Sequence, residues 1–202
     1  MKKEFLSFED SKCIEILLSN NVLAFPTETV YGLGVVYDSK LAFDRLVSLK
    51  KRSPDKPFTV MISSKEDVHK FAYIDEKTQR VINEFFPGEI TLLLKSKKCY
   101  PWVNLNSDTI GIRMSASKDV CKLIGKVGKP LLVTSANISG FEAMNTAEDV
   151  YSTFKDDLKG IVKSSNKSSS VPSTIVLLKD GEIKLIRKGS IPFEKIKKIW
   201  EE

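Results

Sequence analysis

VLAFPTETVYGLGVV, residues 22–36, carries the clearest structural signal in this sequence. Two apolar runs flank a Pro-Thr-Glu-Thr interruption, and Gly32 and Gly34 lie in the second run. Short apolar runs bounded by turn residues predict buried strands. We therefore expect a strand, an exposed turn, and then a second strand or a short helix. The two glycines would let a ligand approach the backbone closely.

Helical and strand-like segments alternate on both sides of this stretch. Periodicity predicts helices at residues 8–20, 41–52, 66–74, 76–86, 118–128 and 147–154. It predicts further strands at residues 58–62, 90–94, 109–114, 130–137, 173–178 and 182–189. This alternation indicates an α/β fold with helices on both faces of one sheet. The turn signal Lys179-Asp180-Gly181 pairs the last two strands, which favours an open, twisted, mixed sheet over an all-parallel one.

The domain prediction depends on KSSNKSSSVP, residues 163–172, the one stretch with linker-like composition. The strands predicted after it are too few to fold alone. We therefore expect a single domain over residues 1–202, in which 163–172 is a mobile loop next to the binding cleft.

Composition excludes several classes of protein and site. The chain is 42% hydrophobic and 29% charged, with no signal-peptide pattern and no apolar run long enough to span a bilayer, so we predict a cytoplasmic protein without membrane association. Three widely spaced cysteines argue against a disulfide framework or a zinc site. The single histidine, His69, is expected at the surface, so catalysis by histidine and a histidine-rich metal site are not expected.

The net charge of +6 fits either a polyanionic partner or a small ligand that carries phosphate. Near a predicted helix end, Lys50, Lys51, Arg52 and Lys56 form a cationic group. Such a group is either a solvated helix terminus, where cations are favoured, or a phosphate site. Neither GxGxxG nor the P-loop pattern occurs, so any nucleotide would be held differently.

TSANISG, residues 134–140, follows a buried apolar run and offers several hydroxyls and an amide. These groups can hold phosphate or carboxylate oxygens, but they are also typical of a helix N-cap or an Asx turn. In an open α/β sheet, ligands bind where strands run into loops, and this segment lies at such a point.

Seven segments in order resemble the YrdC-like family, and the match runs from residue 21 to about 191. They are PTETVYGLG (26–34), KKR…KP (50–57), PGEITLLL (87–94), TIGIRMS (109–115), TSANISG (134–140), PSTIV (172–176) and IRKG (186–189). The resemblance implies the YrdC-like fold and an L-threonylcarbamoyladenylate synthase, a nucleotidyltransferase. Such an enzyme converts L-threonine, bicarbonate and ATP to threonylcarbamoyl-AMP and pyrophosphate for tRNA modification.

The resemblance also implies roles for individual residues. The residues expected to bind ATP are Lys50, Arg52, Lys56, Thr109, Asn137, Asn145 and Arg187. Lys50 and Arg52 are in addition the expected catalytic residues, because cations there would stabilise the charge that develops as pyrophosphate leaves. The residues expected to bind threonine are Thr29, Arg113, Ser135 and Ser173, with Thr27 as the alternative to Thr29. Mg²⁺ would accompany ATP, bound by phosphate oxygens and water rather than by a protein metal site.

The chain departs from the family pattern at several positions. Arg113-Met114-Ser115 replaces the frequent Arg-x-Pro, and Met61 stands where some members have histidine. No second globular segment follows residue 191, so the chain is expected to be a short-form member without the extra carboxy-terminal domain.

Two other functions fit the same residues. An RNA-binding module would bind tRNA or double-stranded RNA with strong salt dependence and without regard to threonine. A YrdC-like paralogue would use a different carbamoyl acceptor. Thr29 and Arg113 favour the synthase, whose partners would be L-threonine, bicarbonate, ATP and the transferase proteins of tRNA modification.

Overall fold

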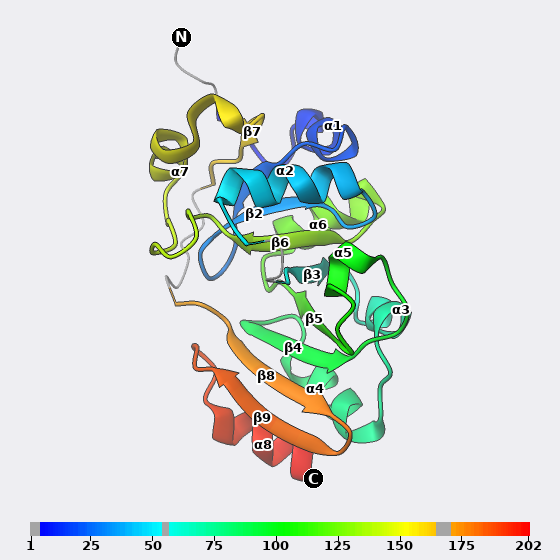
Figure 1. The fold of residues 1–202 in the computed structure, drawn as a ribbon. Coiled ribbons are helices and arrows are strands. Elements are labelled where there is room, and N and C mark those ends of the chain that lie inside the picture. The colour runs from blue at the N-terminus through cyan, green and yellow to red at the C-terminus, as the bar shows by residue number, and fades with distance from the viewer. Residues whose placement is uncertain (1–4, 54–56, 165–170) are drawn as a thin grey trace.

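The computed structural model describes residues 5–53, 57–164 and 171–202. Among these residues, nine strands form one sheet in the order β7-β1-β2-β6-β3-β5-β4-β8-β9 (Figure 1). The strands are β1 (Leu23–Pro26), β2 (Tyr31–Val36), β3 (Thr59–Ile62), β4 (Ile90–Lys95), β5 (Thr109–Met114), β6 (Leu131–Ser135), β7 (Gly160–Ile161), β8 (Thr174–Lys179) and β9 (Glu182–Arg187).

The sheet is mixed, as predicted. β1 and β7, β3 and β5, and β4 and β8 are parallel pairs, and the other neighbours are antiparallel. Residues 22–36 form the antiparallel pair β1 and β2, with Pro26 opposite Tyr31, so the second apolar run is a strand. Asp180 and Gly181 both have positive φ and form the tight turn between β8 and β9.

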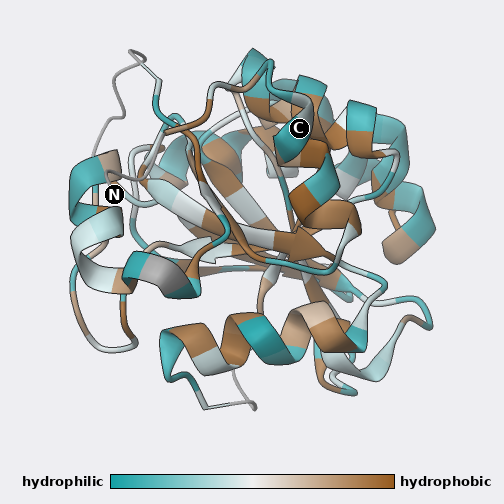
Figure 2. Cartoon of the chain, turned by 90° about the horizontal axis from the view of Figure 1, so that it is seen from above, coloured by the Kyte–Doolittle hydropathy of each residue, from teal (hydrophilic) through white to brown (hydrophobic). Residues whose placement is uncertain are grey.

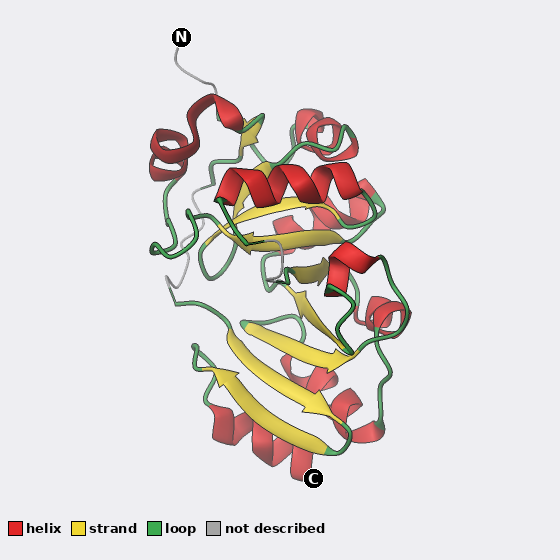
Figure 3. Ribbon diagram, in the orientation of Figure 1, coloured by secondary structure: helices red, strands yellow, loops and turns green. Residues whose placement is uncertain are grey.

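Helices cover both faces of the sheet, which confirms the predicted class (Figure 2). The helices are α1 (Ser11–Leu18), α2 (Lys40–Lys50), η1 (Lys65–Asp67), α3 (Val68–Phe71), α4 (Glu76–Phe85), α5 (Pro101–Asn104), α6 (Lys118–Val127), α7 (Ala147–Phe154), η2 (Lys155–Asp157) and α8 (Phe193–Glu201). In the view of Figure 3, α2 lies in front of β2 and β6, whereas α4 and α8 lie behind β4, β8 and β9. In this view, no helix of the described residues lies in front of these last three strands.

Helix α6 shows why the sequence folds in this way. Ser117 caps its start by accepting a hydrogen bond from the Val120 amide, and Gly128 ends it at φ 73°. Its apolar residues Val120, Leu123, Ile124 and Val127 are buried on one face. Each such side chain stabilises the fold by about 1.5–3 kcal/mol relative to an exposed one.

Four elements differ from the prediction. The helix predicted at 66–74 is a short 3₁₀ turn and a single α-helical turn that end at Phe71, because Tyr73 donates a backbone hydrogen bond to Lys95 of β4. α5, β7 and α8 were not predicted. β7 is a two-residue strand, too short for a periodic signal. α8 does have an amphipathic pattern, and it buries Ile196 and Trp200.

Other sequence-based expectations concern the surface and the cysteines. His69 is exposed, and the three cysteines are free thiols. A search of the described residues finds no helix that is both long and apolar enough to cross a membrane. Most of the Ser-rich stretch 163–172 lies outside the described residues.

Candidate active site

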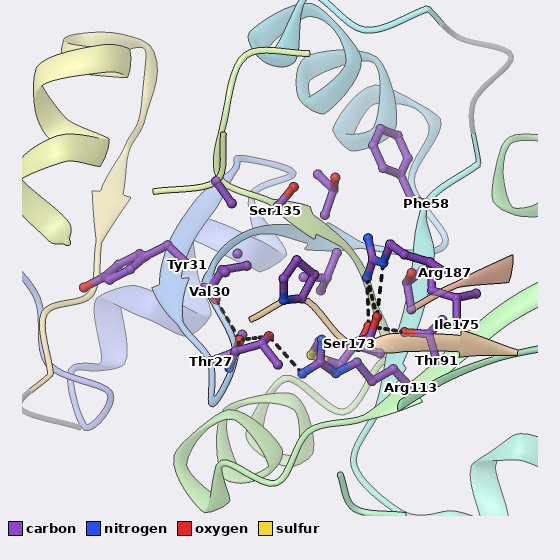
Figure 4. A pocket seen from close by; sticks show the side chains of 18 of the residues that line it. Thr27, Val30, Tyr31, Phe58, Thr91, Arg113, Ser135, Ser173, Ile175 and Arg187 are labelled. Carbon is purple, nitrogen blue, oxygen red and sulfur yellow. Dashed lines mark hydrogen bonds between the residues drawn. The ribbon is translucent and has the colours of Figure 1, made fainter. Parts of the chain in front are cut away.

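The strands bring their ends together around a cavity of about 260 Å³ (Figure 4). It lies between the β1–β2 turn, the end of β6, the end of β5 and the start of β8. The residues that line it are Thr27, Thr29, Val30, Tyr31, Gly32, Arg52, Pro57, Phe58, Thr59, Met61, Thr91, Arg113, Val133, Thr134, Ser135, Ala143, Pro172, Ser173, Ile175 and Arg187.

The β1–β2 turn places two buried hydroxyls on one wall. Thr27 Oγ1 donates to the Val30 carbonyl at 2.7 Å and lies 2.9 Å from Thr29 Oγ1. Thr27 and Thr29 are 7% and 1% exposed. Both side chains are therefore fixed before any ligand arrives, which lowers the entropy cost of binding.

Arg113, on β5, lies next to these hydroxyls. Its Nη2 donates to Glu28 Oε1 at 2.6 Å and to Thr29 Oγ1 at 3.0 Å. Its Nε is buried and has no hydrogen-bond partner among the described residues. Buried donors are nearly always paired in proteins, so an unpaired nitrogen here is unusual, and it belongs to a residue that lines the cavity.

Glu28 lies behind Arg113 and outside the cavity lining. Its Oε2 accepts a hydrogen bond from the Ser115 hydroxyl. Burial opposes ionisation of this carboxyl, but the charge of Arg113 and the hydrogen bonds of Ser115 and Arg113 outweigh burial and lower its pKa. Glu28 is therefore an anion that balances the charge of Arg113.

Arg187 and Ser173 form the opposite wall. Arg187 donates through Nε and Nη2 to the Ser173 carbonyl, at 3.1 and 2.9 Å, and through Nη2 to Ser173 Oγ at 3.1 Å. Ser173 Oγ lies 2.9 Å from Thr91 Oγ1. Burial and the nearby charge of Arg113 lower the pKa of Arg187.

Gly189 fixes this wall from the side of β9. A Cβ there would lie 2.3 Å from the Thr174 nitrogen and 2.4 Å from the Pro172 carbonyl oxygen. Only a residue without a side chain lets the two backbone segments approach this closely, so Gly189 sets the position of Ser173.

The two cations at the end of α2 occupy different places. Arg52 lines the cavity; its Nη2 donates to the Pro57 carbonyl at 3.1 Å, and its guanidinium lies 5.0 Å from the centre of the Phe58 ring. Lys50 is 1% exposed and does not line the cavity.

The Lys50 ammonium lies beneath the loop that follows β6. Its Nζ donates to the Ser135 carbonyl at 2.5 Å, to the Asn137 carbonyl at 2.8 Å and to Asn137 Oδ1 at 2.9 Å. An ammonium has three donors, so all of them are used. Burial, together with the charge of Arg52, lowers the pKa of Lys50 to about 7, whereas the three oxygens favour its charged form.

The lining has a strong charge asymmetry. Arg52, Arg113 and Arg187 face the cavity, and its described lining contains no carboxylate. Such a cavity attracts anions. Among the described residues there is also no cluster of three His, Cys, Asp or Glu that could hold a metal ion.

The structure brings together six of the predicted site residues and leaves four outside the cavity lining. The six are Arg52, Arg187, Thr29, Arg113, Ser135 and Ser173. The four are Lys50, Thr109, Asn137 and Asn145. Thr109 begins β5, four residues before Arg113, and Asn137 supports the loop after β6. Lys56 lies outside the described residues.

Two contributors were not predicted from the sequence. Thr91 is a polar residue within the apolar run of β4, and that mismatch is a usable signal for a side chain that faces a cavity. Glu28 lies between the two threonines of the turn, but its pairing with Arg113 depends on residues 85 positions apart.

Comparison with known proteins adds to this geometry. Residues 15–189 match the Sua5/YciO/YrdC family model, described as "Telomere recombination". The chain belongs to the Sua5/YciO/YrdC family. A relative from Buchnera aphidicola, named threonylcarbamoyl-AMP synthase, is 35% identical over 193 residues, which cover 93% of this chain and 99% of the relative.

Longer members of the Sua5/YciO/YrdC family are similar as well. The threonylcarbamoyl-AMP synthase of Pyrococcus abyssi is 34% identical, and the match covers 90% of this chain and 54% of that protein. The solved structure of P. abyssi Sua5 in complex with L-threonine has a TM-score of 0.88 at 31% identity, and the match covers 93% of this chain and 56% of that one. Escherichia coli YciO, at 22% identity and a TM-score of 0.83, shares the fold; the match covers 92% of this chain and 91% of that one.

Proposed function

We propose that this protein is an L-threonylcarbamoyladenylate synthase. The observation that carries the proposal is the convergence of three arginines and a set of buried hydroxyls on one cavity. The substrates would bring a carboxylate, bicarbonate and a triphosphate, all of them anions. The similarity to a synthase of nearly the same length, and to a structure that contains L-threonine, supports this choice.

In this proposal the cavity has two sides. Arg113, with Thr29 next to it, binds the threonine carboxylate, because a guanidinium suits a planar acceptor. Ser173 and Ser135 contact the rest of the amino acid and the nucleotide. Arg52 and Arg187 bind ATP phosphates and stabilise the charge on departing pyrophosphate.

We assign Lys50 a positioning role in place of direct phosphate contact, because its three donors already hold the loop of Ser135 and Asn137. Thr109 and Asn145 receive no direct role, since neither lines the cavity. The downstream partners would be tRNA-modification transferase proteins that pass the threonylcarbamoyl group to tRNA.

The chemistry requires two steps in one cavity. The threonine amine attacks the carbon of bicarbonate, a C–N bond forms, and water leaves to give a carbamate. A carbamate oxygen then attacks the α-phosphorus of ATP, and the bond to the β-phosphate breaks as pyrophosphate departs. Holding the reactants at attack distance is worth up to about 7–11 kcal/mol in favourable cases.

The residues that line the cavity indicate how Mg²⁺ would be bound. Mg²⁺ in proteins is usually bound through carboxylates together with phosphates and water, and the described lining of this cavity supplies no carboxylate. The residues therefore do not fit a resident magnesium ion, and Mg²⁺ would enter on the triphosphate of its substrate.

Pyrophosphate release tests the proposal. With ATP and Mg²⁺, we expect release that requires both L-threonine and bicarbonate. Arg52→Ala should lower kcat/KM for ATP by about 10–100-fold, because it removes a charged contact with phosphate. Arg45→Ala is the matched control, since Arg45 is exposed on α2, bonds to the segment around Asn20 and Asn21, and does not line the cavity. Release that is indifferent to threonine, from folded protein, would refute the proposed function.

A further inference from the structure

Arg113 is fixed by a buried network that lies behind the cavity and that the proposed reaction does not use directly. Its Nη2 donates to Glu28 at 2.6 Å, and Ser115, which is 1% exposed, donates to the other oxygen of the same carboxylate. The side chains of Arg113 and Glu28 are 9% and 15% exposed. Both oxygens of Glu28 are thus engaged. Oε1 accepts from Arg113, which lines the cavity, and Oε2 accepts from Ser115, which does not.

This network fixes the guanidinium of Arg113 at the wall of the cavity. Nη2 is held by Glu28 and Thr29, and the buried Nε has no partner among the described residues. A free arginine side chain has several rotamers, and fixing it in advance lowers the entropy cost of binding. Glu28 also offsets part of the positive charge that Arg113 presents to Arg187, whose pKa is lowered by burial and by that charge.

Ser115 connects the network to a rigid element. Its Oγ accepts a hydrogen bond from the Ser117 amide at 3.2 Å, and Ser117 is the N-cap of α6. The position of Glu28 is therefore tied to the start of a ten-residue helix as well as to the β1–β2 turn. A hydroxyl is needed here because it accepts from one group and donates to another.

We infer that Glu28 and Ser115 are positioning residues for the amino-acid carboxylate: they lock the guanidinium of Arg113 at the wall of the cavity. This inference rests on the proposed function, since it takes the carboxylate of L-threonine as the ligand of Arg113. Glu28 touches no substrate in this account. It acts only through the arginine.

This positioning role predicts that the variants raise KM for L-threonine much more than KM for ATP. Glu28→Gln keeps the shape but removes the charge, and it should raise KM for L-threonine by about 10–100-fold, the effect of weakening one charge-assisted contact. Ser115→Ala should raise it by about 3–10-fold, the effect of losing one hydrogen bond that supports Arg113 only through Glu28. KM for ATP should change by less than about twofold in both, because Arg52 and Arg187 are untouched. Glu9→Gln is the control, since Glu9 is an exposed carboxylate that pairs with Lys126 and does not line the cavity.

The sharpest test compares L-threonine with L-threoninamide, which lacks the carboxylate. Affinities of the full chain are measured by calorimetry for the wild type, Glu28→Gln, Ser115→Ala and Glu9→Gln. We expect the preference for threonine over threoninamide to shrink in the first two variants and to persist in the control. If Glu28→Gln does not fold, Ser115→Ala alone decides between the outcomes.

The possible failures are distinguishable. Equal losses for threonine, threoninamide and ATP would mean general structural support and would overturn the positioning role. Unchanged preference in folded variants would overturn it as well, while the proposed function stood. A wild-type protein that does not bind threonine would refute the proposed function, and the inference with it.

Discussion

Replacing Lys50 with methionine is expected to lower the free energy of unfolding by about 3–5 kcal/mol, because three part-buried acceptors lose their donor at a cost of about 1 kcal/mol or more each. Methionine fills a similar volume but cannot donate, so the carbonyls of Ser135 and Asn137 and the Asn137 side chain lose their donor. Because Ser135 lines the cavity, pyrophosphate release should fall by about 100-fold or more, as expected when a site is misplaced. Urea denaturation and the release assay measure the two effects.

Lys51→Met is the matched control for this experiment. Lys51 is the adjacent lysine and is exposed, so the change should be within about 0.5 kcal/mol, as for most surface substitutions. A Lys50→Met protein with normal stability and a loss confined to KM for ATP would contradict the positioning role and restore direct contact with phosphate.

Arg113→Met is expected to have the largest effect on the amino-acid side of the reaction. It removes the proposed carboxylate clamp and should lower kcat/KM for L-threonine by about 10³-fold or more, in line with losses of 3–5 kcal/mol when one partner of a buried charge pair is removed. KM for ATP should change far less. Steady-state kinetics with each substrate varied in turn separate the two.

The same substitution has a consequence for stability that depends on pH. In the wild type, burial opposes ionisation of Glu28, but Arg113 and Ser115 outweigh burial and lower its pKa. The ionised carboxylate therefore stabilises the fold above the unfolded pKa, near 4.5. This stabilisation is lost as the pH falls through the folded pKa. Arg113→Met removes this contribution. The stability difference between wild type and variant should therefore be largest near pH 7 and shrink below about pH 4.

Arg45→Met serves as the control, because Arg45 is an exposed arginine of α2 that donates to Asn20 and Asn21 instead of Glu28. An Arg113→Met enzyme that keeps its KM for threonine would show that the carboxylate is bound elsewhere. A stability difference that does not depend on pH would argue against an ionised Glu28 in the native state.

The fold was largely predictable because its main signals are local. The β1–β2 pair, the N-caps at Ser117 and Thr146 and the turn at Asp180-Gly181 are each set by a few neighbouring residues. β7 depends on pairing with β1, which lies far away in sequence, and its two residues have no periodicity of their own. The early end of α3 likewise depends on a hydrogen bond to β4.

The site was predictable in part. Resemblance indicated Arg52, Arg113, Ser173 and Arg187, and these residues converge on the cavity. It did not separate Arg52, which lines the cavity, from Lys50, which lies beneath a loop, because two positions at a helix end can point in different directions.

Ser115 stands where the family frequently has proline, and the sequence alone did not explain this difference. Its hydrogen bond to Glu28 links residues 87 positions apart, and the pair lies in register only because the β1–β2 turn reaches the end of β5. Networks of this kind require the tertiary structure.

The product of the proposed reaction can be detected directly. The protein is incubated with ATP, Mg²⁺, L-threonine and ¹³C-labelled bicarbonate, and the mixture is analysed by mass spectrometry. Our account predicts threonylcarbamoyl-AMP that carries one ¹³C atom from bicarbonate, formed in the same amount as pyrophosphate and strongly reduced in Arg113→Met. Pyrophosphate or AMP without a labelled threonine adduct would contradict it and would indicate a different acceptor in this cavity.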